Sequence, residues 1–144
     1  YKSLEELERC DFLPFRAGIE VDAAFVMAGH ISLPNVLNDQ TPASLSYEIV
    51  TEILRKKMQF NGIIITDALN MGAISQHYSS GEAAVMAVDA GVDMLLMPTD
   101  FYAAYEALLN AVQEGRISQE RINESVLRIL QTKEKMKEIC HADA

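Results

Sequence analysis

The stretch "FNGIIITDALNMGAIS", residues 60–75, decides the fold. Within it, Ile63, Ile64 and Ile65 form a continuous apolar run of strand length, which follows Gly62. A strand that is apolar at consecutive positions is buried on both faces, as in a parallel sheet covered by helices. Burial alone does not call for a carboxylate, yet Asp67 stands at the end of this strand.

Two more apolar runs of strand length lie on either side of the first. They are "AAFVMAG", residues 23–29, and "MLLMP", residues 94–98. Apolar residues at helical spacing predict helices over residues 46–58, 79–90, 101–114 and from 118 onward. The order strand, helix, repeated three times, predicts an α/β fold with a parallel sheet. No linker or low-complexity segment divides residues 1–144, so one unit is expected.

Local signals fix several helix ends. Ser3 with Glu6 and Ser79 with Glu82 match the capping box, and Pro14 suits the first turn of a helix. Gly91 and Gly115 are expected to end helices, and Ser118 is expected to begin the last one. In that last helix, Ile117 and Ile122 fit a hydrophobic staple, and the spacing predicts a buried face made of Val126, Ile129 and Leu130.

Composition and charge narrow the classes of partner. The chain has 144 residues, 49% of them hydrophobic and 23% charged, which is typical of one globular domain. Its net charge of −9 argues against a nucleic acid or an anionic membrane as partner. No apolar run reaches the roughly 20 residues of a membrane-spanning helix. Because Tyr1 is not an initiator methionine, upstream residues are expected to exist, and the compartment, cytoplasmic or secreted, stays open.

No metal or cofactor is expected. Cys10 and Cys140 lie far apart and belong to no metal-ligand spacing, so both are interpreted as free thiols. Gly72 stands alone and does not form a phosphate-binding loop.

Ligands of parallel sheets and barrels bind at the carboxyl ends of the strands. That rule selects His30, Asp67 and the "PTD" of residues 98–100. Asp67 either projects into a cleft or caps the next turn, and His30 is either a hydrogen-bonded rim residue or part of a site. Asp100 is interpreted as the N-cap of the helix that follows it, and Met71, in the loop after Asp67, as a packing or pocket residue.

A longer pattern is more specific. The run "ILRKKMQFNGIIITDALN", residues 53–70, resembles the active-site signature of glycoside hydrolase family 3, and similarity extends over "LPFRAGIEVDAAFVMAGH", "GEAAVMAVDAGVDMLLMP" and "RINESVLRIL". Within that family, "DALNMGAI" resembles the β-N-acetylhexosaminidase branch. The β-glucosidase branch usually has a tryptophan soon after the aspartate, and this chain has no Trp. Ala68 departs from the second acidic residue that many relatives carry there.

The resemblance implies a fold and a set of roles. The fold would be the C-terminal portion, about three βα units, of a (β/α)8 TIM-type barrel, which needs roughly 250 residues when complete. Asp67 would be the nucleophile of a retaining mechanism, and His30 and Met71 would line the sugar pocket. The family's acid/base histidine and its assisting aspartate lie on a loop that precedes this region, so the acid/base group is expected to be absent from residues 1–144.

Two hypotheses of different class follow. In the first, the parent protein is a retaining glycosidase that removes terminal N-acetyl-β-hexosamine, with β-glucosidase or β-xylosidase as the alternative, while the isolated fragment is inactive. In the second, the chain is a non-catalytic half-barrel that associates through its exposed interior face at Ile63, Ile65 and Leu95, giving a homo-oligomer. A doubly wound oxidoreductase is disfavoured because a Gly-rich fingerprint is missing.

Overall fold

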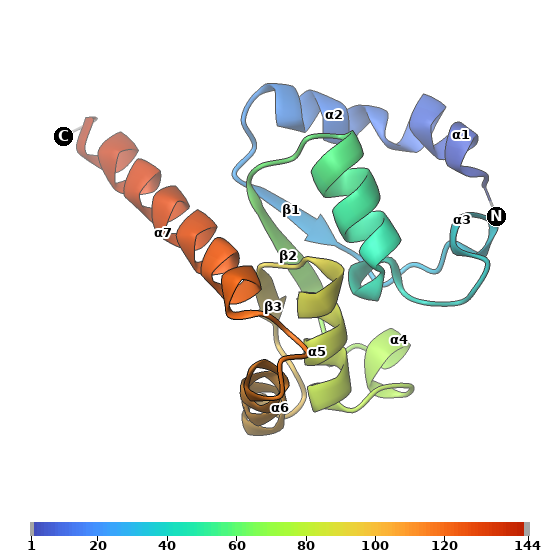
Figure 1. Ribbon diagram of the computed structural model, residues 1–144. Coiled ribbons are helices and arrows are strands. Elements are labelled where there is room, and N and C mark those ends of the chain that lie inside the picture. Colours follow the sequence, from blue (N-terminus) through green and yellow to red (C-terminus); the bar gives the residue numbers. More distant parts are fainter. Residues whose placement is uncertain (1, 143–144) are drawn as a thin grey trace.

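Three parallel strands form the centre of the molecule (Figure 1). The computed structural model describes residues 2–142 and the side chains of residues 2–137. The strands are β1 (Phe25–Ala28), β2 (Ile63–Ala68) and β3 (Met94–Leu96). They lie in the order β1-β2-β3, with Val26 opposite Ile64 in the register. Neighbours in sequence are therefore neighbours in space, as in consecutive βα units of a barrel.

Helices connect and cover the strands. In chain order they are α1 (Leu4–Glu6), η1 (Leu7–Asp11), α2 (Leu13–Glu20), α3 (Pro34–Leu37), η2 (Ala43–Leu45), η3 (Glu48–Lys57), α4 (Gly72–Ser75), α5 (Ser80–Ala90), α6 (Phe101–Gln113) and α7 (Gln119–Ala142). The helix η3 ends in a wide turn, in which the Met58 N–H donates to the carbonyl of Ile53, five residues earlier. The segment between β1 and η3 contains two short helical turns, α3 and η2.

Most of the predicted helix ends are confirmed. Ser3 and Ser79 each accept a hydrogen bond from a backbone N–H three residues later, and the capping glutamates bond back. Those hydrogen bonds hold the pKa of Glu82 below its usual range, because they favour the carboxylate. Gly91, with φ of 111°, ends α5, and Asp100 caps α6 through the Ala103 N–H.

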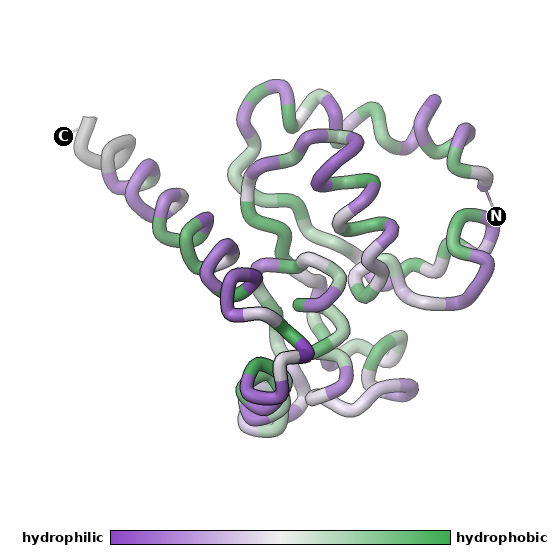
Figure 2. The backbone as a smooth tube through the Cα atoms, in the orientation of Figure 1, coloured by the Kyte–Doolittle hydropathy of each residue, from purple (hydrophilic) through white to green (hydrophobic). Residues whose placement is uncertain are grey.

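One face of the sheet packs against helices and forms the main core. Ile64 and Thr66 of β2 are fully buried there, and Val26 lies beside them against η3 and α5. The backbone coloured by hydropathy shows β1 and β2 as hydrophobic and η3 as alternating, as expected of a buried sheet and an amphipathic helix (Figure 2). A smaller core joins α5 to α6 through Val85, Val88 and Ala111.

The other face of the sheet is partly bare, at positions that differ from the prediction. Phe25 and Met27 of β1 are 43% and 51% exposed. The expectation that Ile63 is exposed is wrong, since it is only 1% exposed at the start of β2, the strand that α7 contacts. Leu95 is half-buried because it packs against both core clusters on the helix-covered face.

The last helix also differs from the prediction. Ile117 and Ile122 do belong to the smaller core, as the staple predicts. Val126 and Leu130, predicted to be buried, are 46% and 57% exposed. The reason is visible in Figure 1: α7 extends away from the body of the molecule, so within the described residues little packs along it.

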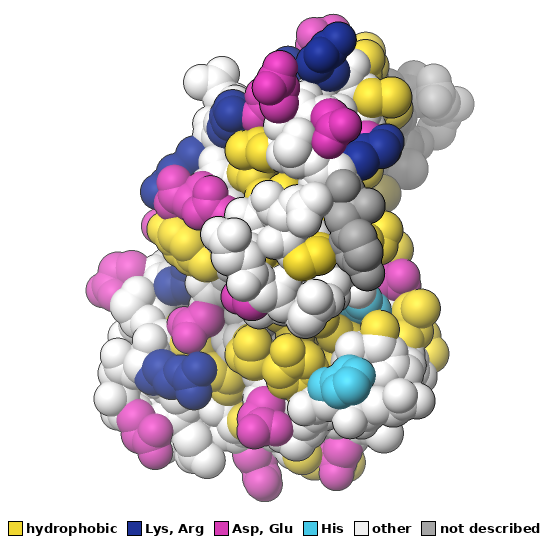
Figure 3. Space-filling model, turned by 90° about the vertical axis from the view of Figure 1, so that its right-hand side faces the viewer, with side chains coloured by type: hydrophobic (Ala, Val, Ile, Leu, Met, Phe, Trp, Pro, Cys, Tyr) yellow, Lys and Arg dark blue, Asp and Glu magenta, His cyan; other side chains and the backbone are white. Residues whose placement is uncertain are grey.

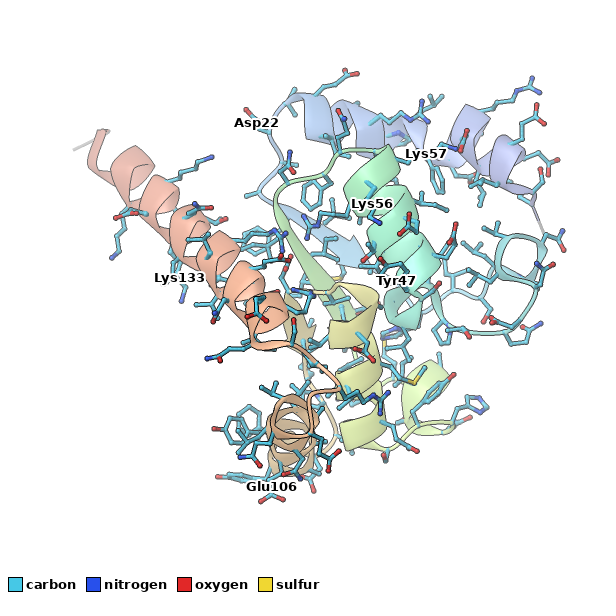
Figure 4. The ribbon with its side chains drawn as sticks, in the orientation of Figure 1. Asp22, Tyr47, Lys56, Lys57, Glu106 and Lys133 are labelled. Carbon is cyan, nitrogen blue, oxygen red and sulfur yellow. The ribbon has the colours of Figure 1, made fainter. Side chains whose placement is uncertain are left out.

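Polar contacts and apolar patches share the outer surface. Lys57, labelled at the end of η3 in Figure 4, pairs with Glu8 of η1, and this contact ties the N-terminal helices to η3. Asp22, with φ of 57°, forms the turn from α2 into β1.

The face that carries the N-terminus shows apolar patches between charged side chains (Figure 3). No helix within residues 2–142 has the length and apolar character needed to cross a bilayer.

Gly62, at the entry to β2, gives a first testable prediction. A Cβ at this position would lie 2.7 Å from the carbonyl oxygen of Ala24 and 2.6 Å from Cζ of Phe60. Gly62→Ala is therefore expected to lower the free energy of unfolding by about 1–3 kcal/mol, as overpacking does. Gly18→Ala, within α2, is the control, because its new Cβ would have the Cβ of Ala23, 3.8 Å away, as its nearest contact. Urea denaturation giving equal midpoints for the two variants would contradict the prediction.

Candidate active site at the carboxyl end of β2

Asp67 occupies the second-last position of β2, so the strand continues past the apolar run of residues 63–65. Strand alternation places its side chain on the face of Ile63 and Ile65, opposite the helix-covered face. The carboxylate is half-buried, and its Oδ1 accepts the N–H of Ala68 at 2.7 Å. Among the side chains of residues 2–137 it forms no ion pair, so Oδ2 remains available to a ligand.

The neighbouring strand β3 holds the end of β2 in place. Thr66 Oγ1 accepts the N–H of Leu96 at 3.0 Å, and the Leu69 N–H donates to the Leu96 carbonyl at 2.9 Å. The Asn70 N–H donates to the carbonyl of Met97 at 3.0 Å. Met97 has φ of 48°, a conformation that is uncommon for a residue with a side chain. Backbone on both sides of Asp67 is thus fixed by hydrogen bonds.

His30 reaches the same segment from the other side. It follows β1, and its Nε2 lies 3.0 Å from the carbonyl oxygen of Ala68. Its Nδ1 lies 2.7 Å from Oγ of Ser44, a fully buried residue of η2. Both ring nitrogens are therefore occupied by protein groups, which leaves only the ring edge and face for other contacts.

Met71 stands at the start of α4. Its side chain is 45% exposed, and its backbone N–H donates to the carbonyl of Ala68 at 3.1 Å. The structure thus brings the backbones of Asp67, Ala68 and Met71 and the ring of His30 together. Asp100 is engaged elsewhere, as the N-cap of α6.

A buried charged cluster at the start of β3 was not predicted from the sequence. The side chain of Asp93 is fully buried, and three arginines approach it: Arg55 at 2.7 Å, Arg128 at 3.0 Å and Arg121 at 3.8 Å. The Ile64 N–H donates to Asp93 Oδ2 at 3.0 Å, and the Ser125 hydroxyl donates to Oδ1. Burial lowers the pKa of Arg55 and Arg121, and the charge of Asp93 opposes that shift.

Arg55 explains part of the signature in residues 53–70. Its Nη1 donates to the carbonyl oxygens of Phe60 and Gly62, both at 2.7 Å, while Nη2 binds Asp93. A single guanidinium thus joins the end of η3 to the start of β2 and to β3. The spacing from Arg55 to Gly62 was the only sequence signal for this cluster. The Asp93 cluster lies at the amino ends of the strands, whereas ligands of barrels bind at the carboxyl ends. We therefore interpret the cluster as stabilising the fold rather than binding a ligand.

Comparison with known proteins places the chain in a family. Residues 1–132 match the model of the "Glycosyl hydrolase family 3 N terminal domain". The chain belongs to glycoside hydrolase family 3. The predictions of the family and of a partial α/β barrel are thereby confirmed.

Individual relatives match almost the whole chain. It is 31% identical over 92% of its length to "Beta-hexosaminidase A" of Pseudoalteromonas piscicida, and 28% identical over 91% to "Beta-N-acetylglucosaminidase/beta-glucosidase" of Cellulomonas fimi. The structure of a family 3 β-N-acetylglucosaminidase from Paenibacillus sp. str. FPU-7 matches 92% of the chain, with 41% identity and a TM-score of 0.89. The chain spans about a quarter of each: 25% of both curated relatives and 26% of the Paenibacillus chain.

Proposed function

We propose that the protein carrying this chain is a retaining glycosidase that removes terminal N-acetyl-β-hexosamine, with N-acetylglucosamine as the expected sugar. The observation that carries the proposal is the carboxylate of Asp67. It stands at the carboxyl end of β2, its Oδ1 is oriented by the Ala68 N–H, and its Oδ2 is free within the described residues. A retaining glycosidase needs a carboxylate held in this way beneath the sugar ring.

The proposed reaction has two steps. Asp67 Oδ2 attacks the anomeric carbon and forms an ester, while the bond to the aglycone oxygen breaks and that oxygen receives a proton from a general acid. Water then attacks the anomeric carbon, gives up a proton to the same group, and releases the Asp67 carboxylate. Two inversions give net retention. The acid/base group is proposed to come from outside residues 1–144.

The names of the relatives support the choice of sugar. "Beta-hexosaminidase A" of P. piscicida is named for hexosaminides, and the Paenibacillus enzyme is named as a β-N-acetylglucosaminidase. The C. fimi relative carries both names, which keeps a β-glucoside as the second candidate substrate. His30 and Met71 are proposed to lie at the edge of the sugar pocket, with His30 offering its ring rather than its nitrogens.

The substrate and the stereochemistry are tested together. The full-length protein is expected to hydrolyse a chromogenic N-acetyl-β-glucosaminide faster than the matched β-glucoside. Proton NMR of the fresh reaction should show the β-anomer of the released sugar first. First appearance of the α-anomer would contradict a retaining mechanism, and a faster β-glucoside would reverse the choice of substrate.

Residues 1–144 alone are proposed to be one fragment of the barrel and to lack turnover. Without the acid/base group, departure of the leaving group is unassisted, which forfeits roughly 10² to 10⁴ in rate. We expect the purified chain to show no hydrolysis of the same chromogenic substrate at high protein concentration. Turnover that disappears in the Asp67→Ala chain would contradict this prediction, because it would place all required groups within 144 residues.

The isolated chain is also proposed to associate with itself. Within the described residues β1 and β3 each pair on one edge only, and Phe25 and Met27 expose apolar surface beside the free edge of β1. Burial of such surface stabilises by about 25 cal/mol per Å². We expect light scattering to show a homodimer or larger species. A monodisperse monomer at micromolar concentration, with cooperative unfolding, would show that the chain completes its own core.

A further inference from the structure

We infer that His30 is a positioning residue for Asp67, oriented in turn by Ser44, rather than a residue that binds the sugar through its ring nitrogens. The inference rests on the proposed function of Asp67. It follows from a continuous chain of contacts that joins the loop after β1 to the carboxylate at the end of β2.

Hydrogen-bond chemistry assigns the proton on the His30 ring. A carbonyl oxygen only accepts, so the Nε2 atom 3.0 Å from the Ala68 oxygen must carry hydrogen and donate it. In the neutral ring Nδ1 is then an acceptor, and the Ser44 hydroxyl at 2.7 Å donates to it. Ser44 thereby selects the tautomer that can hold Ala68.

The backbone keeps Ser44 in place for this task. Its N–H donates to the carbonyl of Gly29 at 3.1 Å, directly beside His30, and the Ala43 N–H donates to the carbonyl of Ile31. The loop of residues 31–43 therefore closes on itself before Ser44. Because Ser44 is fully buried and part of η2, its hydroxyl has little freedom to turn away.

Ala68 transmits the position of His30 to the carboxylate. Its carbonyl is held by His30 and by the Met71 N–H, while its own N–H holds Asp67 Oδ1. Without the His30 contact, the Ala68 carbonyl keeps only the contact within its own loop. Ala68, whose N–H orients the nucleophile, would then lose its link to the loop after β1. Displacements of about 1 Å in a catalytic group cost on the order of 10²-fold in rate.

The test uses full-length protein with His30→Ala, His30→Gln and Ser44→Ala. We expect His30→Ala to lower kcat by about 10- to 100-fold while KM stays within a factor of about three. His30→Gln should recover most of that loss, because its amide nitrogen can donate to the Ala68 carbonyl in place of Nε2. Ser44→Ala should lower kcat several-fold with KM unchanged. His77→Ala, at an exposed histidine, is the matched control and should leave both constants unchanged.

Each outcome decides between the two proposals. A raised KM with normal kcat in His30→Ala would make the ring a sugar contact and overturn the inference, as would normal kinetics in both His30→Ala and Ser44→Ala. If His30→Ala does not fold, as judged by its thermal unfolding, His30→Gln and Ser44→Ala still decide. A loss of kcat of about 10-fold or more in His30→Gln, or no loss in Ser44→Ala, contradicts the inference. If turnover survives Asp67→Ala, the proposed function itself is contradicted, whatever the His30 variants show.

Discussion

Asp67→Ala is expected to lower kcat of the full-length protein on an N-acetyl-β-glucosaminide by at least about 10⁴-fold, because the covalent step loses its nucleophile. Stability should change little, since the only hydrogen bond described for this carboxylate is to the adjacent Ala68 N–H. Asp100→Ala is the control: it removes a helix cap, worth about 1 kcal/mol, and should keep turnover within a few-fold. Comparable losses in both variants would contradict a specific role for Asp67.

The chemistry of the loss can be checked with an added nucleophile. In Asp67→Gly, azide is expected to enter the space of the missing carboxylate and attack the anomeric carbon of a substrate with a good leaving group. One bond forms to azide, the bond to the leaving group breaks, and the product is a glycosyl azide of inverted configuration. Azide that restores no turnover, or that gives an azide of retained configuration, would contradict the placement of Asp67 beneath the ring.

Asp93→Ala is expected to have the largest effect on stability, a loss of about 3–5 kcal/mol in the free energy of unfolding. The side chain of Asp93 is fully buried, and its removal leaves the guanidinium groups of Arg55 and Arg128 close together without their shared anion. The Ile64 N–H also loses its side-chain acceptor. Chemical denaturation of the full-length protein measures the change.

The control for Asp93 is another aspartate that pairs with an arginine. Asp89 is exposed and lies 3.5 Å from Arg116, so Asp89→Ala should cost less than about 1 kcal/mol. High salt should weaken the Asp89 pair and affect the Asp93 cluster much less, because buried charges are poorly screened. Similar losses for Asp93→Ala and Asp89→Ala would show that the buried cluster contributes no more than a surface pair.

Features with local causes could be predicted from the sequence. The capping boxes at Ser3 and Ser79 and the end of α5 at Gly91 depend on residues a few positions apart, and all three are observed. The three strands could be predicted because each is a short apolar run. The strand β2 continues to Ala68, past its apolar run, because the N–H groups of Leu69 and Asn70 donate to the carbonyls of Leu96 and Met97 and so fix the backbone beyond Asp67.

Features with distant causes could not be predicted. Asp93 looks like an ordinary turn residue before β3, and its partners Arg55 and Arg128 lie 38 and 35 residues away. The contact of His30 with Ala68 spans 38 residues and depends on the register of β1 and β2. The periodicity of α7 identifies an apolar face, but periodicity does not say what covers it, and so Leu130 was wrongly expected to be buried.

Covalent trapping tests the central claim most directly. A fluorinated N-acetylglucosaminide, which forms the glycosyl ester quickly and hydrolyses slowly, is incubated with the full-length protein, and the digested protein is sequenced by mass spectrometry. We predict a single added sugar on the carboxylate of Asp67, in the peptide that contains "GIIITDALN". A sugar attached to a different residue, while Asp67 remains unmodified in the inactivated enzyme, would contradict the assignment of Asp67 as the nucleophile.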